Sequence, residues 1–306
     1  AEYEQYFKIT DIMPVNSVGI VTARDKLTIQ DSPEEVWNIV NDFAALDIEE
    51  AREKYNLGED SRDWKVDFAQ EDIKNSNLNK DKISPILYRP FDKKFTYYTG
   101  KSRGFICMPR PEVMKNIIHH NNLALITVRQ VAEGIFNHTF ITDSIPESRV
   151  TLSNKGICIV FPFYIYPDTS KPQELQQEKR PNFSEDFLKK IEINLGYIPI
   201  PETIFYYIYA IFHSPTYRSR YAEFLKIDFP RVPLTSNNEL FCQLAEYGEE
   251  LVALHLMKSP KLNNLITQYT ENGGSQIVDA GHPKYTKGAV VINKKGDKFV
   301  GVPEQV

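Results

Sequence analysis

The segment from Gly156 to Tyr166 constrains the fold more than any other part of the chain, because it is a nearly continuous run of apolar and aromatic residues. A short run of this kind is typical of a strand that is buried on both of its faces. The sequence therefore predicts that these residues form a central strand of a sheet.

Shorter segments before this run have β-type patterns. Residues 15–25 are rich in β-branched side chains, residues 83–98 indicate strand and turn, and residues 123–129 and 139–142 indicate strands. Ser32-Pro33-Glu34-Glu35 is a capping box with proline at the first helical position, so we expect a helix that begins there, breaks near Asp47 and resumes to about Tyr55. A short helix is expected from Pro111 to His120.

The character of the chain changes after the polar, proline-interrupted stretch from Asp168 to Pro181. Four helices are expected to begin at Ser184, Pro201, Pro215 and Asn238, and a β-hairpin is expected near Ala289. Tyr206, Tyr209 and Phe212 repeat every three residues and are assigned to the core. The sequence thus predicts an α+β fold, with a mixed sheet over residues 1–170 and a helical scaffold with a terminal hairpin over 171–306, packed together as one domain.

Charge is distributed unevenly along the chain, whose net charge is -5. Residues 31–74 carry 14 Asp and Glu against 5 Lys and Arg, whereas residues 82–131 carry 9 Lys and Arg against 2 acidic residues. This distribution allows a local site for a polyanion. On charge alone, a solvated basic face beside an acidic one is the more common cause of such a distribution.

Common catalytic signatures are absent from the sequence. It contains no phosphate-binding GxxxxGK[ST] loop, no GxGxxG, no HExxH and no paired CxxC. Asp92-Lys93-Lys94 has the Asp-x-Lys spacing of half a metal-dependent nuclease site, but no convincing acidic partner precedes it. His119 and His120 are adjacent and cannot share one helix face, so they are assigned to helix capping rather than to a metal.

The basic stretch alternates Arg and Lys with Tyr, Thr and Ser in loops that contain Pro and Gly. Such side chains contact DNA phosphates, and Arg and Gln can also read guanine and adenine edges. Lys93, Lys94 and Lys101 are expected to anchor phosphates, and Arg129 and Gln130, at a predicted strand end, to contact bases. The candidate DNA-binding residues are Arg24, Lys26, Arg89, Lys93, Lys94, Tyr97, Tyr98, Lys101, Arg103, Arg110, Arg129, Gln130, Ser153, Asn154 and Lys155.

Several segments resemble the C-terminal specificity domain of Type ISP and related single-chain Type IIG restriction-modification enzymes. The resemblance depends most on residues 204–231, IFYYIYAIFHSPTYRSRYAEFLKIDFPR, and also on 15–25, 86–92, 126–130 and 161–167. It implies sequence-specific recognition of duplex DNA by a chain that is not itself catalytic and that is cut at both ends. The acidic stretch before residue 75 and the tail around Asn272 depart from the pattern.

The resemblance also implies a parent enzyme. The parent would be an adenine-N6 DNA methyltransferase with a nuclease and, in some members, an ATP-driven translocase, so S-adenosylmethionine, Mg²⁺ and ATP are expected there and no cofactor in this chain. The expected partners are double-stranded DNA and the methyltransferase domain of the same parent chain, without a membrane. Three dispersed cysteines and the lack of an export signal indicate the cytoplasm. The alternatives are a protein-interaction scaffold and a small nuclease that uses Asp92.

Overall fold

The structure, a computed structural model, describes residues 2–131, 134–151, 156–167, 178–273 and 276–304. The chain divides into two compact units, Ala1–Leu256 and Met257–Val306. The division predicted between residues 170 and 171 is a different one and stays a prediction. Helices combine with antiparallel and mixed sheets, which confirms the α+β class. In the described part of the chain, no helix combines the length and apolarity that crossing a membrane requires.

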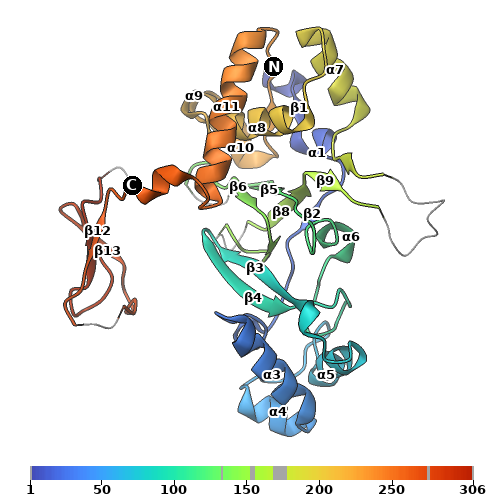
Figure 1. The fold of residues 1–306 in the computed structure, drawn as a ribbon, viewed down its shortest axis with the longest axis vertical. Helices are drawn as coiled ribbons and strands as arrows, with labels where there is room; N and C mark the ends of the chain where they lie inside the picture. The colour runs from blue at the N-terminus through green and yellow to red at the C-terminus, as the bar shows by residue number, and fades with distance from the viewer. Residues whose placement is uncertain (1, 132–133, 152–155, 168–177, 274–275, 305–306) are drawn as a thin grey trace. The chain divides into compact units, whose positions relative to one another are not determined.

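A four-stranded antiparallel sheet in the order β2-β8-β5-β6 lies in the middle of the first unit (Figure 1). Its strands are β2 (Ser17–Val18), β5 (Ala124–Val128), β6 (Phe140–Thr142) and β8 (Cys158–Pro162). β8 pairs with β2 on one side and with β5 on the other, so the predicted central strand is confirmed. Along β8, Val160 contributes to one hydrophobic cluster and Phe161 to another, so both faces of the strand are covered.

The cluster on one face includes the N-terminal helices and a second, mixed sheet in the order β4-β3-β7. These elements are α3 (Pro33–Ala45), α4 (Ile48–Lys54), α5 (Val66–Asn75), β3 (Ile83–Arg89), β4 (Asp92–Tyr97) and β7 (Ile145–Pro146). The predicted capping box starts α3: Glu35 N donates to Ser32 Oγ at 3.2 Å, and Ser32 N donates to Glu35 Oε2 at 3.1 Å. α4 follows Asp47, as expected.

The cluster on the other face is built largely by helices, which Figure 1 shows at the opposite end of the unit from α3–α5. They are α7 (Glu185–Leu195), α8 (Pro201–His213), α9 (Pro215–Arg220), α10 (Ala222–Ile227) and α11 (Asn238–His255). The four predicted helix starts are confirmed, with a break at Tyr221 that divides the third helix. Tyr209 and Phe212 are fully buried, as expected, and Tyr206 is half-buried. α8 and α11 are in close contact, because a Cβ atom at Gly248 would lie 1.9 Å from Tyr206 O.

Two local predictions are wrong. The strand expected over residues 15–25 is limited to β2, because Ile20 and Val21 bridge to different partners, Glu147 and Met108, before α2 (Asp25–Thr28) begins. The helix expected from Pro111 to His120 ends at Met114 as α6 (Pro111–Met114). The buried Asn116 causes this end, since its side chain donates to Val113 O and accepts from Tyr166 N.

The remaining elements of the first unit are short. β1 (Phe7–Lys8) pairs with β11 (Arg231–Val232), β9 (Tyr164–Ile165) pairs with β10 (Arg180–Pro181), and α1 (Ile9–Ile12) follows β1. The β1–β11 pairing brings the N-terminal segment to the chain that follows α10.

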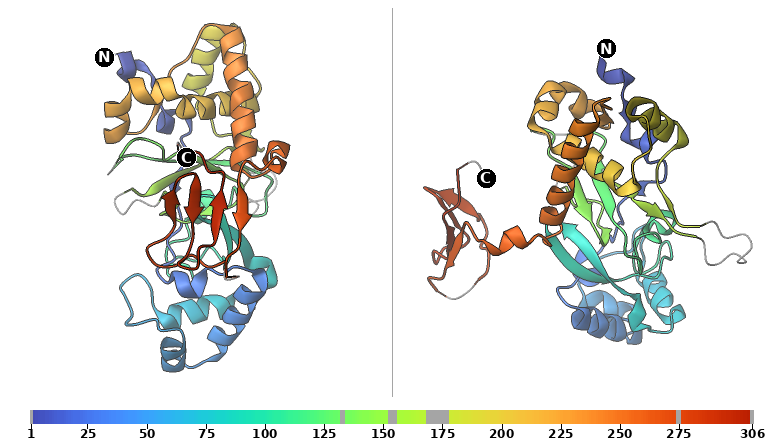
Figure 2. Two further views of the ribbon diagram at one scale, coloured as in Figure 1. Left: turned by 90° about the vertical axis from the view of Figure 1, so that its left-hand side faces the viewer. Right: turned by 45° about the horizontal axis from the view of Figure 1, so that its top comes forward.

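The second unit contains an antiparallel sheet in the order β12-β15-β14-β13, which Figure 2 shows with its strands side by side. Its strands are β12 (Gln268–Thr270), β13 (Lys284–Thr286), β14 (Ala289–Val291) and β15 (Lys298–Val300). β14 and β15 form the predicted terminal hairpin. Buried Asp297 stabilises the connection between them, since its carboxylate accepts from Asn293 Nδ2 at 2.7 Å.

Candidate nucleic-acid interface

The fold brings the acidic and basic stretches of the sequence into contact. Three cations of the basic segment, defined here as residues 82–110, pair with carboxylates of the acidic segment, residues 31–74. The pairs are Lys94–Asp31 at 2.6 Å, Lys101–Glu71 at 3.9 Å and Arg103–Asp63 at 3.9 Å. The hydrogen bond to Asp31 raises the pKa of Lys94. Lys93 likewise pairs with Asp143, so these four cations have carboxylate partners within the chain.

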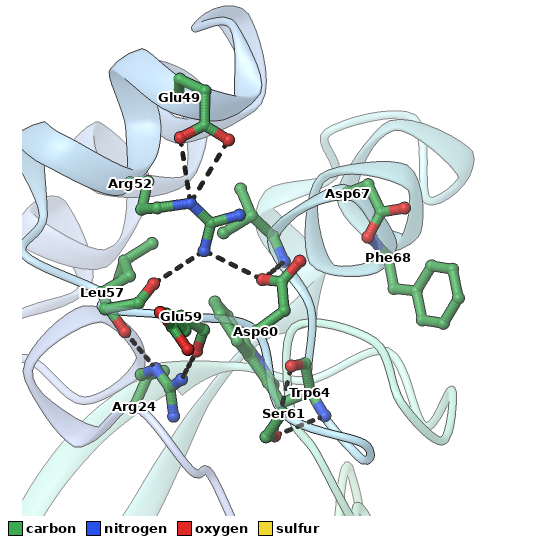
Figure 3. A network of polar contacts seen from close by, with 12 residues as sticks. Arg24, Glu49, Arg52, Leu57, Glu59, Asp60, Ser61, Trp64, Asp67 and Phe68 are labelled. Atoms are coloured by element: carbon green, nitrogen blue, oxygen red, sulfur yellow. Dashed lines mark hydrogen bonds and ion pairs between the residues drawn. The ribbon is translucent and has the colours of Figure 1, made fainter.

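Arg24 is held by an internal network (Figure 3). Its Nε donates to Leu57 O at 2.9 Å and its Nη2 donates to Glu59 O at 3.0 Å. The guanidinium also lies over the Trp64 ring, 4.8 Å from the ring centroid. Arg24 therefore fixes the loop after α4. Lys26, by contrast, is exposed and has no ion pair with any residue that the structure describes.

Arg89 forms the most buried ion pair of the candidate set. Its Nη1 lies 2.9 Å from Glu147 Oε2, and the Glu147 side chain is only 6% exposed. The guanidinium also stacks over the Tyr88 ring at 3.8 Å from its centroid. The carboxylate of Glu147 accepts further hydrogen bonds from Ser148 Oγ and Arg149 N. Arg89 thus joins β3 to the segment after β7.

Tyr97 and Tyr98 lie in the core rather than on the surface. Tyr97 Oη is the acceptor for Asn79 N, and Tyr98 Oη donates to Pro109 O at 2.8 Å. Desolvation raises the pKa of Tyr98 well above its usual value. Burial on this scale favours a packing role for both side chains. Arg110 is half-buried, with Nη2 3.4 Å from Met108 Sδ.

The two glycines of the basic segment meet local packing and backbone requirements. Gly104 faces Asp72, whose Oδ2 would lie 2.1 Å from an added Cβ atom. That carboxylate accepts from Phe105 N at 2.9 Å and from Thr99 Oγ1 at 2.9 Å. Gly100 has φ of +83°, a conformation that other residues rarely adopt.

Arg129 and Gln130 directly follow β5 and are exposed. Arg129 Nε lies 3.5 Å from Asp228 Oδ1, although the Arg129 side chain remains 67% exposed. Lys8 is closer to the same carboxylate, at 2.7 Å. Partial burial alone would raise the pKa of Asp228, but the hydrogen bond from Lys8 and other contacts lower it. Gln130 Nε2 donates to Ile227 O at 3.3 Å. Arg129 is therefore a candidate base-reading residue whose side chain remains available on the surface.

The remaining candidates divide into three groups. Ser153, Asn154 and Lys155 lie outside the described residues. Asp92 begins β4 and belongs to no group of three potential metal ligands within the described ranges, where no such group occurs. His119 and His120 lie beyond the end of α6, so the capping interpretation is wrong. The His120 ring stacks on the Tyr166 ring, with 3.7 Å between the ring centroids.

The sequence interpretation missed one cation, Arg218 in α9. Its charged group is half-buried and has no ion pair with a described residue. The surrounding sequence, Ser214 to Arg220, mixes polar residues with Pro215 and Tyr217, and no pattern in it distinguishes a buried arginine from an exposed one.

A family model for the Type ISP C-terminal specificity domain matches residues 11–306. The chain belongs to this family. The match includes the acidic segment and the tail around Asn272, which the sequence resemblance alone did not align. A search of curated proteins gives no match for this specificity domain.

Solved structures share the fold. A DrdV–DNA complex is 21% identical over 99% of this chain and 32% of its own, with a TM-score of 0.65. The ATP-dependent Type ISP restriction-modification enzyme LlaBIII bound to DNA is 19% identical, over 99% of this chain and 20% of its own, with a TM-score of 0.68. A nuclease-deletion mutant of the Type ISP enzyme LlaGI with a DNA substrate mimic is 21% identical, over 99% of this chain and 28% of its own, with a TM-score of 0.64. The specificity domain thus spans a fifth to a third of the chains that it matches.

Proposed function

We propose that this specificity domain recognises a short sequence in duplex DNA on behalf of a larger restriction-modification enzyme. The match to the specificity-domain family over residues 11–306 carries the proposal. Its support is that the similar solved chains are described as bound to DNA or to a DNA mimic. Exposed Arg129 at the end of β5 supplies a side chain that can form two hydrogen bonds to a guanine edge.

We also propose the activity of the parent chain, an adenine-N6 methyltransferase and nuclease that uses S-adenosylmethionine, Mg²⁺ and, if it translocates, ATP. The residues of the specificity domain do not fit these groups, because the sequence has no glycine-rich phosphate loop and the described residues contain no cluster of metal ligands. The groups would bind to other parts of the parent. A radiolabelled methyl-transfer assay on the purified specificity domain should therefore give only background, and turnover abolished by a substitution within it would contradict the proposal.

DNA binding by the isolated specificity domain should be weak and strongly dependent on salt. A few phosphate contacts release counterions, so affinity should fall steeply between about 50 and 200 mM salt. Fluorescence anisotropy with a labelled duplex measures this dependence. An affinity that does not change over this range, or no binding at low salt, would contradict DNA recognition and would leave the scaffold alternative.

Arg129→Ala tests sequence recognition directly. Selection from a randomised duplex library first defines the preferred site, and a panel of single-base-pair variants then measures preference. Loss of Arg129 should cost about 1–3 kcal/mol on the preferred site and relax the choice at one base pair. Arg62→Ala is the matched control, because Arg62 is 86% exposed and also pairs with an aspartate. An unchanged preference together with a lowered melting temperature would assign Arg129 only to its pair with Asp228.

A further inference from the structure

A pocket of about 380 Å³ lies between the segment that follows β5 and helices α9 and α10. Phe136 and Pro215 contribute apolar walls, and Arg218, Ala222 and Lys226 also line it. Most of the lining is apolar, so Arg218 is a charged group in a poorly hydrated place. An unpaired charge in such surroundings is unfavourable, and an anion that entered the pocket would relieve that cost.

Arg218 has hydrogen-bond acceptors but no counter-ion among the residues that the structure describes. Its Nε donates to Phe212 O at 2.6 Å, and its Nη2 lies 3.1 Å from His213 Nδ1. Across the described ranges, no carboxylate lies within ion-pair distance of its guanidinium. Desolvation lowers the pKa of Arg218, in keeping with an unneutralised charge. The C-terminal carbonyl of α8 satisfies one edge of the guanidinium and leaves the other nitrogen able to donate.

The neighbouring imidazole does not neutralise this charge. Burial, the charge of Arg218 and His255 lower the pKa of His213 to about 3, so this ring is neutral near pH 7. With Nδ1 accepting from Arg218, the ring proton is assigned to Nε2, a buried atom without a hydrogen bond of normal geometry. The wall of the pocket therefore carries the full positive charge of Arg218.

The pocket adjoins the candidate base-reading residue. Val131 N donates to Lys226 O at 3.0 Å, and Gln130 Nε2 donates to Ile227 O. The strand end that carries Arg129 is thus attached to α10, one wall of the pocket. Lys226 pairs with Glu223 at 2.9 Å, an exposed pair between residues one turn apart that is worth little.

We propose that this pocket binds one phosphate of the DNA backbone, with Arg218 as its anchoring cation. The inference rests on the proposed function and identifies a contact that would set the register of Arg129 on the duplex. The deoxyribose would lie against Phe136 and Pro215, and the phosphate would supply a counter-ion for Arg218, which has none within the described ranges. A guanidinium suits a phosphate because it presents donors in a planar fork. Such a contact positions the protein and carries no sequence information.

Ala222→Glu tests the phosphate site without removing Arg218. The new carboxylate, four residues after Arg218 in the same pocket, supplies an internal counter-ion that competes with phosphate. Ala222→Gln has almost the same shape and no charge, so the difference between the two variants reports charge alone. Glutamate is also favourable at this first position of α10, so both variants should remain folded. Melting curves of the two variants check that they remain folded.

Binding of the whole 306-residue chain is measured on two unrelated duplexes over a salt series. Ala222→Glu should weaken both complexes by a similar factor of roughly 3–10 and reduce the salt slope by about one, whereas Ala222→Gln should bind like the wild type. Equal affinities for the wild type and both variants would overturn the phosphate site while leaving DNA recognition intact. No duplex binding by the wild type would remove the proposed function and the site together.

A second measurement distinguishes the source of the phosphate ester. Deoxyadenosine monophosphate is added at millimolar concentration and the melting temperature is followed. One outcome would overturn the DNA assignment: the free nucleotide stabilises the wild type and Ala222→Gln but not Ala222→Glu, while duplex affinity is the same for all three proteins. The pocket would then be a site for a free nucleotide. Loss of duplex affinity in Ala222→Glu, with or without this stabilisation, supports the DNA assignment.

Discussion

The basic segment and the Arg218 pocket differ in how their positive charges are compensated. In the basic segment, Lys94, Lys101 and Arg103 each pair with a carboxylate of the acidic segment. In the pocket, Arg218 is half-buried and has no carboxylate partner in the part of the chain that the structure describes. The density of cations along a sequence therefore does not measure the positive potential of the folded surface, because partners that are distant in sequence can cancel it.

The largest expected effect comes from breaking a compensated pair inside the basic segment. Arg89→Ala would leave the Glu147 carboxylate buried without its cation, which should lower the free energy of unfolding by about 3 kcal/mol. Urea denaturation at pH 7 measures the change. Arg103→Ala is the control, because Arg103 is 60% exposed and 3.9 Å from Asp63, so its loss should cost less than about 1 kcal/mol. Equal losses in the two variants would show that burial does not distinguish these pairs.

The fold was predictable because its signals are local. The apolar run of β8, the capping box at Ser32 and the proline at Pro201 each specify an element from neighbouring residues alone. The α6 prediction failed where a tertiary contact intervened, namely the bond from Tyr166 N to the Asn116 side chain. Helix ends are thus less predictable than helix starts when a buried polar side chain competes for the backbone.

The candidate site was less predictable because its partners are distant in sequence. Arg24 binds the carbonyl of Leu57, Arg89 binds Glu147, and Arg129 is close to Asp228. None of these pairings has a sequence period, so residue type and loop context could not separate cations that stabilise the fold from cations that remain available. Arg218 was missed for the same reason, since its burial depends on the segment that follows β5.

The next effect concerns His213, whose pKa is lowered by burial and by the neighbouring charge of Arg218. Its pKa of about 3 in the folded state lies below the value of roughly 6.5 for an unfolded histidine. As the pH falls below about 6.5 the unfolded chain takes up a proton that the folded chain does not, so stability is full above this pH and falls towards pH 3. The slope should be about 1.4 kcal/mol per pH unit.

Urea denaturation at pH 6 and pH 5 measures this loss in the wild type and in His213→Asn. Asparagine can still accept from Arg218 but does not titrate, so its pH dependence should be shallower. His119→Asn, at an exposed position, should retain the wild-type slope. A slope unchanged by His213→Asn would mean that His213 does not stay neutral over this range.

The smallest expected effect tests whether compensation hides DNA affinity in the basic segment. Lys101 is 44% exposed and its Nζ lies 3.9 Å from Glu71, a distance typical of weak surface pairs worth about 0.2–1 kcal/mol. Glu71→Gln should free Lys101 for phosphate and raise duplex affinity about twofold at low salt, with no gain at high salt because screening removes the attraction.

Glu239→Gln removes the same charge from α11, where Glu239 is exposed and accepts from Gln243 Nε2. If the gain comes from net charge alone, the two variants should bind equally. If it comes from releasing Lys101, only Glu71→Gln should gain, and adding Lys101→Ala should abolish the gain. Anisotropy titrations of the three variants at two salt concentrations decide between these outcomes. A gain that survives Lys101→Ala would show that this lysine does not face the DNA, and the basic segment would then serve to hold the acidic segment in place.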